Sequence, residues 1–112
     1  MASGDVNPKR LGGPTVLGTS TTTIISAVAA GKQQTIKQIA ITNTTGIDRW
    51  FTLAIGSAAT PANCLIFRLP ITAYDTIIWD TALVLEATET LQGLCDAPSA
   101  VNVTATGWDK EL

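Results

Sequence analysis

The side chains that could perform chemistry are few in this sequence, and they limit what it could catalyse. The 112 residues include no histidine. Ser-His-Asp and Cys-His arrangements are therefore impossible, and the commonest general base and metal ligand are missing. The sequence has no Gly-rich phosphate-binding loop either. We therefore expect a protein that is not an enzyme, with no catalytic residue and no cofactor.

Carboxylates in the second half of the chain offer the next chemistry to consider. The candidates are Asp75, Asp80, Glu86, Glu89 and Asp96. A glycosidase needs two carboxylates across a cleft, and a chain of this length offers little room for one. Calcium would suit the last three, which lie at or beside turns, but they lack EF-hand spacing. We interpret all five as solvated turn residues and predict no metal site.

Aromatic side chains leave carbohydrate binding open as an alternative. Trp50 has the outward parity of its strand and Trp108 lies near the C-terminus, so both are candidates for exposed rings that could stack on a sugar. Nucleic-acid binding would need basic residues interleaved with aromatics, whereas the 7 Lys and Arg are scattered and the net charge is −2. We expect neither nucleic acid nor membrane as a partner.

The two cysteines lie in apolar stretches. Cys64 begins Cys-Leu-Ile-Phe and Cys95 ends Leu-Gln-Gly-Leu-Cys. The N-terminus has no apolar segment of the kind found in secretory signals, so synthesis in a reducing cytoplasm is expected. We therefore predict two free thiols that behave as small hydrophobic residues.

The composition indicates a protein that buries more than its own core. Hydrophobic residues make up 46% of the chain and charged residues 14%, against about 25% charged in an average soluble domain. Residues 11–31 and 50–67 carry no charge at all. Because monomers rarely expose large apolar areas, the composition favours a subunit of an assembly.

Short β segments separated by turn residues follow one another from Thr19 onward. The expected segments are 19–27, 35–43, 50–56, 64–69, 74–79, 83–85, 90–95 and 101–108. A break in alternation near Lys37-Gln38 predicts a bulge. About eight strands at this spacing, with no helix, predict an antiparallel β-sandwich over residues 19–112, jelly-roll-like or Greek-key.

Alternation within the segments predicts which side chains face the core. The predicted inward-facing residues are Ile39, Ile41, Phe51, Leu53, Ile55, Leu65 and Phe67.

Residues 1–18 differ from the rest and are predicted to be an extended N-terminal arm. Several Gly and Pro residues would break a helix or a central strand there. The apolar side chains of this segment are too sparse to form a core, so we expect the arm to lie on a neighbouring subunit. The predicted partner-binding residues are Val6, Lys9, Arg10, Leu11, Val16 and Leu17.

The order of these segments supports a resemblance. The relevant stretches are PKRLGGP at 8–14, a Thr-rich strand, IKQIAITN at 36–43 with a Thr-Gly turn, FTLAIG at 51–56, LVLEA at 83–87 and VNVTATG at 101–107. The chain resembles small β-sandwich virion structural proteins of tailed bacteriophages, which serve as capsid decoration (cement) proteins or as head–tail and tail accessory proteins.

The resemblance implies a non-enzymatic structural protein of the phage particle, synthesised in the host cytoplasm. Capsid decoration is the favoured role and a tail or neck accessory role the alternative. A cement protein of this type is a homotrimer that bridges neighbouring subunits of the major capsid protein. Its partners would therefore be itself and the major capsid protein, or another virion protein.

Overall fold

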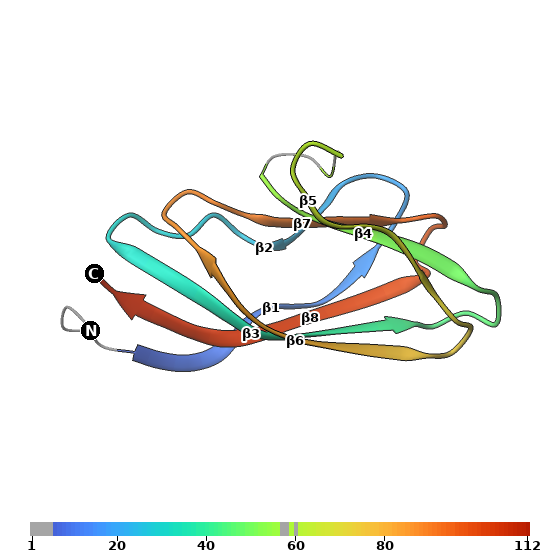
Figure 1. Ribbon diagram of the computed structural model, residues 1–112, viewed down its shortest axis with the longest axis horizontal. Coiled ribbons are helices and arrows are strands. Elements are labelled where there is room, and N and C mark those ends of the chain that lie inside the picture. Colours follow the sequence, from blue (N-terminus) through green and yellow to red (C-terminus); the bar gives the residue numbers. More distant parts are fainter. Residues whose placement is uncertain (1–5, 57–58, 60) are drawn as a thin grey trace.

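Two antiparallel four-stranded sheets face each other in the computed structural model, which describes residues 6–56, 59 and 61–112 (Figure 1). The first sheet has the order β1 (Val6–Leu17), β8 (Val101–Glu111), β3 (Lys32–Asn43) and β6 (Thr76–Leu85). The second has the order β2 (Thr22–Ile25), β7 (Leu91–Cys95), β4 (Arg49–Ile55) and β5 (Cys64–Ile71). This is the strand order of a jelly roll. The predicted all-β antiparallel sandwich is confirmed.

The core lies between the two sheets and is filled by the inward-facing side chains of both. Four of the predicted core residues are 0% exposed: Ile39, Ile41, Phe51 and Leu53. Ile55 and Leu65 are partly buried and pack against this core. The alternation in β3 and β4 therefore identified the inner face correctly.

Phe67 is the exception, and its predicted inward position is wrong. Its side chain is 47% exposed. The pairing of β4 with β5 shifts register on both sides of Leu53, and Arg68 has a φ of 49°. The N–H of Arg68 donates to the Thr52 hydroxyl at 3.0 Å. This bulge rotates the middle of β5, so simple alternation does not continue through Phe67.

The predicted arm is also corrected for residues 6–17, while residues 1–5 lie outside the described residues. Residues 6–17 form β1, which pairs with β8 from Val6 opposite Lys110 to Leu17 opposite Val101. The prolines and glycines that argued against a central strand are compatible with an edge strand, because one side of it needs no ladder hydrogen bonds. The sandwich therefore includes this segment and begins before Thr19.

The strand count agrees with the prediction, but the strands are not all the same. β1 is added, and the predicted segments 74–79 and 83–85 join into the single strand β6. Asp80, which we expected in a turn, lies within β6 and accepts a hydrogen bond from the Gln38 amide of β3 at 3.1 Å.

The predicted bulge in β3 is confirmed. The register of β3 shifts between Ile36 and Gln38 against both of its neighbours. Gly107 of β8 lies opposite, where a Cβ would collide with the carbonyl oxygen of Thr35. Only glycine allows the backbone of β3 to approach β8 this closely.

Candidate interaction surfaces

Five of the nine large exposed apolar residues of the described chain lie in β5, β6 and the turn between them. We call residues 64–85 the β5–β6 flank. Its large exposed apolar residues are Phe67, Leu69, Tyr74, Ile78 and Val84. Its 22 residues include only three charged ones, Arg68, Asp75 and Asp80. A concentration of apolar surface with so little charge is typical of a protein–protein contact.

The four edge strands differ in how well they are protected against pairing with another chain. β1 contains Pro8, Pro14 and the basic pair Lys9-Arg10, and its register is broken twice. β2 has only 4 residues. β5 contains Pro70 and the bulge at Arg68. Prolines, positive charges, bulges and shortness are the devices by which natural edges avoid pairing.

β6 has fewer of these devices, although its pairing with β3 shifts register between Asp80 and Leu83. It runs for 10 residues without Pro, Gly, Lys or Arg, and Asp80 is its one charged residue. Its outward side chains alternate regularly with half-buried ones, and they include Ile78 and Val84. β6 is therefore the edge most open to an added strand.

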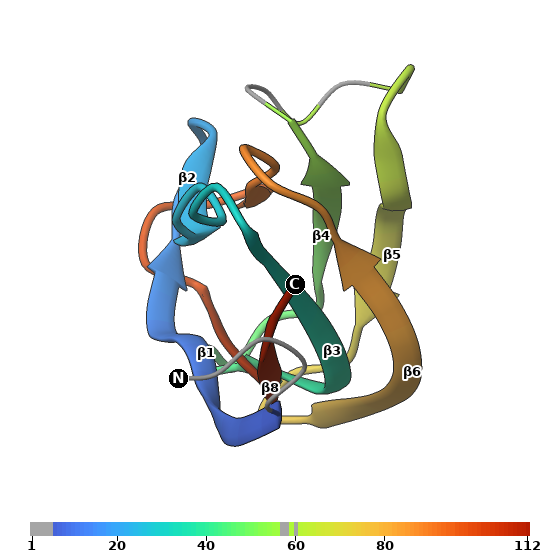
Figure 2. The same ribbon diagram turned by 90° about the vertical axis from the view of Figure 1, so that its left-hand side faces the viewer.

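The opposite flank, formed by β1 and β2, is closed. A Cβ on Gly12 of β1 would collide with the carbonyl oxygen of Ile24 in β2 and contact the side chain of Ile25. The two sheets therefore approach each other closely on this side. Figure 2 shows β1 and β2 together on the left and β5 and β6 on the right.

The predicted partner-binding residues of the arm are not brought together on one surface. Leu17 is fully buried in the core and Leu11 packs partly against it. Val6, Arg10 and Val16 are exposed. Leu17 therefore cannot contact a partner in the folded chain, whereas Val6, Arg10 and Val16 can.

Lys9 has a partner within its own chain rather than on a neighbour. Its Nζ lies 2.7 Å from Oδ2 of Asp109, which is buried at 3% exposure. Burial alone would raise the pKa of Asp109. Hydrogen bonds from Lys9 and Gln34, together with the positive charges of Lys9 and Lys32, outweigh burial and hold this pKa below its ordinary value. The pair fastens β1 to the C-terminal end of β8.

The two candidate aromatics are half-buried, so neither is a freely exposed ring. The guanidinium of Arg68 lies 4.9 Å from the centre of the Trp50 ring and 5.3 Å from that of Phe67. This cation–π contact occupies one face of the Trp50 ring. Trp108 lies in β8 between Pro8 of β1 and Thr35 of β3.

The five candidate carboxylates are engaged locally and do not form a common site. Each has a contact within the chain: Asp75 with the Thr76 N–H, Asp80 with Gln38, Glu86 with Gln33, Glu89 with the Glu86 N–H, and Asp96 with Arg49. Across the residues that the structure describes, no three acidic or cysteine side chains form a group that could hold a metal ion. The described residues also enclose no pocket. No helix in the described ranges could span a membrane.

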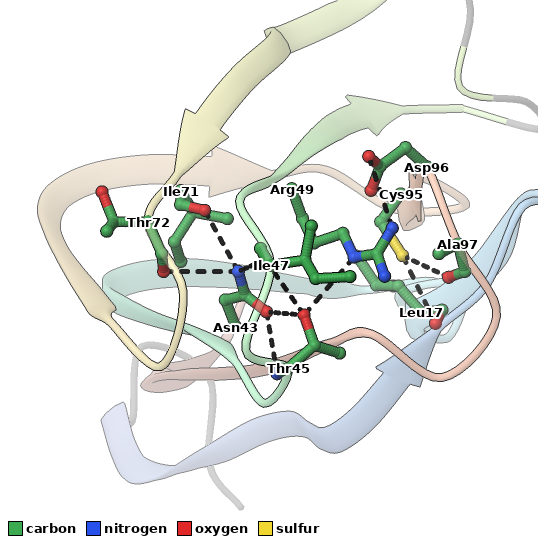
Figure 3. Close-up of polar contacts among 10 residues, drawn as sticks. All are labelled: Leu17, Asn43, Thr45, Ile47, Arg49, Ile71, Thr72, Cys95, Asp96 and Ala97. Carbon is green, nitrogen blue, oxygen red and sulfur yellow. Dashed lines mark hydrogen bonds and ion pairs between the residues drawn. The ribbon is translucent and has the colours of Figure 1, made fainter.

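One end of the sandwich is held by a buried amide that sequence reasoning missed (Figure 3). The Asn43 amide nitrogen donates to the carbonyl oxygens of Ile47, Ile71 and Thr72 at 2.8, 3.1 and 3.3 Å. Its oxygen accepts from the N–H and the hydroxyl of Thr45 at 2.9 and 2.7 Å. This network ties the β3–β4 turn to the β5–β6 turn and so positions one end of the β5–β6 flank.

The two cysteines are free and lie apart. Cys64 pairs with Ala54 and Cys95 with Phe51, on opposite sides of β4. Two strand spacings and three residues separate them, about 14 Å between Cα atoms. A disulfide spans at most about 7 Å between Cα atoms, so this fold does not allow one.

Comparisons with known proteins identify no family. No protein-family model matches the chain, and no curated protein matches it. Among solved structures, it is similar to a chain in the structure of infectious bursal disease virus, Gt strain, with a TM-score of 0.40 and 12% sequence identity. The match covers 96% of this chain and 30% of the viral one. We take no functional conclusion from a likeness of this degree.

Proposed function

We propose that this protein is a non-enzymatic structural protein of a bacteriophage particle, and that it decorates the capsid and stabilises the assembled head by bridging neighbouring capsid subunits. The observation that carries this proposal is the β5–β6 flank, in which five large apolar side chains are exposed and only three residues are charged. The resemblance of the strand segments to phage virion proteins points in the same direction.

The mechanism is mass action. A protein that binds the assembled lattice but not free capsid subunits stabilises the lattice by its binding free energy. A jelly roll with a weakly charged flank suits this task, because little electrostatic desolvation opposes contact with another protein surface. Its partners would be the major capsid protein and further copies of this chain, for which the resemblance implies a trimer.

The exposed residues Val6, Arg10 and Val16 of β1 would supply a second contact. Because exposed ion pairs contribute only about 0–1 kcal/mol each, Arg10 would matter less than apolar contacts.

Locating the protein in purified phage particles by cryo-EM or immunogold labelling tests the proposal. Density or label distributed over the head supports capsid decoration. Label at the neck or tail would replace it with the accessory role, and particles without the protein would overturn the structural role altogether.

A glycan array with the free protein tests the carbohydrate-binding alternative. We expect no binding, because Trp50 and Trp108 are both half-buried and Arg68 lies over one face of the Trp50 ring. Glycan binding that is lost in Trp50→Ala would favour a host-attachment module instead.

A further inference from the structure

We propose that one end of this chain docks on the outer face of the first sheet of a second copy. This inference rests on the proposed function and names one contact between copies in the assembly. The two surfaces differ, so every copy carries both of them. A contact of this heterologous kind can close into a ring, which agrees with the expected trimer.

The docking end consists of the β3–β4 and β5–β6 turns, at the right of Figure 1. We call residues 44–48 and 72–75 the tip. Tyr74 is 76% exposed and Ile47 61%, the two highest values among the large apolar side chains of the described residues. The tip contains no Lys or Arg, and its two carboxylates, Asp48 and Asp75, are exposed. It therefore presents apolar side chains together with negative charge.

The two turns of the tip are fixed to each other, which lowers the entropy lost on binding. The N–H of Tyr74 donates to the carbonyl of Thr45 at 3.0 Å, and its ring lies against Gly46, where a Cβ would be 3.1 Å from the phenolic oxygen. The Asn43 amide joins the same turns (Figure 3). Tyr74 also has a φ of 57°, and strained residues held in place by their surroundings cluster at functional sites.

The charges of the tip remain available to a partner. Through Oδ1, each carboxylate accepts one backbone N–H, at 3.1 Å for Asp48 and 2.8 Å for Asp75. The second oxygen of each has no partner among the described residues. Arg49, which follows the tip, pairs with Asp96 instead.

The receiving surface lies at the opposite end of the molecule, where β1 begins and β8 ends (Figure 1). Side chains alternate along β8, and Asp109 is buried on the inner side, so Trp108 and Lys110 point outward. Pro8 lies opposite Trp108 and shares this outer face. Val6 lies opposite Lys110 in the same way. The residues of this outward surface, which we call the basic face, are Val6, Pro8, Arg10, Trp108 and Lys110.

The basic face complements the tip in polarity and in charge. Pro8 and the half-buried ring of Trp108 supply apolar contact area for Tyr74. Arg10 and Lys110 form no ion pair with another described residue, so they are available to the carboxylates of the tip. Two tips facing each other would oppose four carboxylates, and two basic faces would oppose four cations. The charges therefore favour the tip against the basic face.

A single contact of this kind is small. An end of 24 × 18 Å covers about 430 Å² of its partner, whereas a typical specific interface buries about 800 Å² on each side. In a closed ring, each copy makes the contact twice, once through its tip and once through its basic face. We therefore expect weak open pairs and a more stable ring.

Charge reversal tests the contact. In analytical ultracentrifugation at up to about 0.5 mM, the natural chain should associate reversibly up to a trimer, and less so as salt is raised. D48K/D75K reverses the tip and R10E/K110E reverses the basic face. Alone, each variant should show a dissociation constant about tenfold higher or more, because like charges then meet. An equimolar mixture of the two should form mixed pairs, which also shows that both variants fold.

Tyr74→Ala tests the apolar part of the contact, with Phe67→Ala as the matched control. Both substitutions remove an exposed ring from the β5–β6 flank, but only Tyr74 belongs to the tip. Y74A should raise the dissociation constant about tenfold, and F67A should leave it unchanged. Equal effects of the two would contradict docking through the tip.

Three other results would each overturn the proposal. They are a natural chain that stays monomeric over the whole concentration range, a D48K/D75K variant that associates like the natural chain, and a mixture that remains dissociated.

Co-sedimentation of the same variants with phage particles separates this inference from the proposed function. If the natural chain is monomeric and still binds particles, the contact between copies is wrong and the structural role stands. Loss of that binding in D48K/D75K would then assign the tip to another virion protein. If the chain associates as described but is absent from particles, the contact stands and the proposed function is wrong.

Discussion

Asn43 allows a stringent test of how the loop end of the sandwich is held. Its side chain is fully buried, and its nitrogen donates to three backbone carbonyls (Figure 3). Asn43→Asp replaces that nitrogen by an oxygen of nearly the same size. The variant therefore keeps the packing and changes only the hydrogen bonding and charge.

We expect a large loss of stability at pH 7. A carboxylate oxygen would face carbonyl oxygens at the 2.8–3.3 Å now spanned by the amide, with no donor between them. The two N–H groups of the amide share these three contacts, so about two hydrogen bonds of 0.5–1.5 kcal/mol each are lost, and the burial of a charge raises the expected loss to about 3–5 kcal/mol. That is a large fraction of the roughly 6–17 kcal/mol expected for a domain of this length.

The loss should depend on pH in a defined direction. Burial against carbonyl oxygens would raise the pKa of the introduced carboxyl in the folded state above its unfolded value of about 3.9. The cost of burying the charge is therefore absent below about pH 4, where the carboxyl is protonated in both the folded and the unfolded state. This cost grows as the pH rises toward the folded-state pKa. Once protonated, the acid can also donate one hydrogen bond to these carbonyl oxygens.

Urea unfolding followed by tryptophan fluorescence, at pH 4 and pH 7, measures both effects. Asn43→Ala is the control for pH dependence: it loses the donated hydrogen bonds and also those accepted from Thr45, but it gains no titratable group. Each variant is compared with the natural chain at the same pH. A deficit of less than about 1 kcal/mol for Asn43→Asp at pH 7 would refute the reasoning, because the lost hydrogen bonds alone exceed it. A deficit equal at both pH values would refute the electrostatic part.

Three further predictions follow from the burial, charge and thiol positions. Phe51→Ala should lower the free energy of unfolding by about 3–5 kcal/mol and Phe67→Ala by only about 1–2 kcal/mol, because the Phe51 ring is fully buried and the Phe67 ring is half exposed. Equal losses in urea unfolding would contradict the inner face assigned to β4. Because the folded-state pKa of Asp109 is depressed, the stability that its carboxylate contributes is present above about pH 4 and is lost as the pH falls through that pKa. Lys9→Met should move this loss to higher pH in acid titrations followed by circular dichroism. An unchanged midpoint would show that Lys9 does not hold the carboxylate. Thiol titration of the denatured, unreduced protein should return two free thiols per chain, and none would contradict the separation across β4.

Much of the fold could be predicted because the information is local. Alternation in β4 and the broken alternation near Lys37 are properties of a few adjacent residues, and both were confirmed. The misplacement of Phe67 has a different origin. The bulge at Arg68 depends on the Thr52 hydroxyl of the neighbouring strand, which no pattern within β5 reveals.

The edge position of β1 could not be predicted from its composition. Prolines and glycines exclude a central strand, but an arm and an edge strand share that composition. What decides between them is the pairing with β8, fastened by Lys9 and Asp109, which lie 100 positions apart in the sequence. The same distance hid the role of Asn43, whose partners come from two separate turns.

The flank was missed because exposure is a property of the assembled sheets. Ile78 and Val84 look like core residues in the sequence, since β6 is apolar on both faces. Only the position of β6 at the end of its sheet shows that one face and one edge remain uncovered.

The pairing of β1 with β8 also determines how this chain must fold. β8 lies between β1 and β3, so the first sheet lacks an inner strand until β8 has been synthesised. Before that, β1 has no strand to pair with, and β3 exposes an unpaired side. Contacts across nearly the whole sequence close slowly, because a long loop must be ordered before they form, and all-β domains of this kind fold in milliseconds to seconds. During synthesis on the ribosome, the sandwich therefore forms after release of β8 rather than strand by strand.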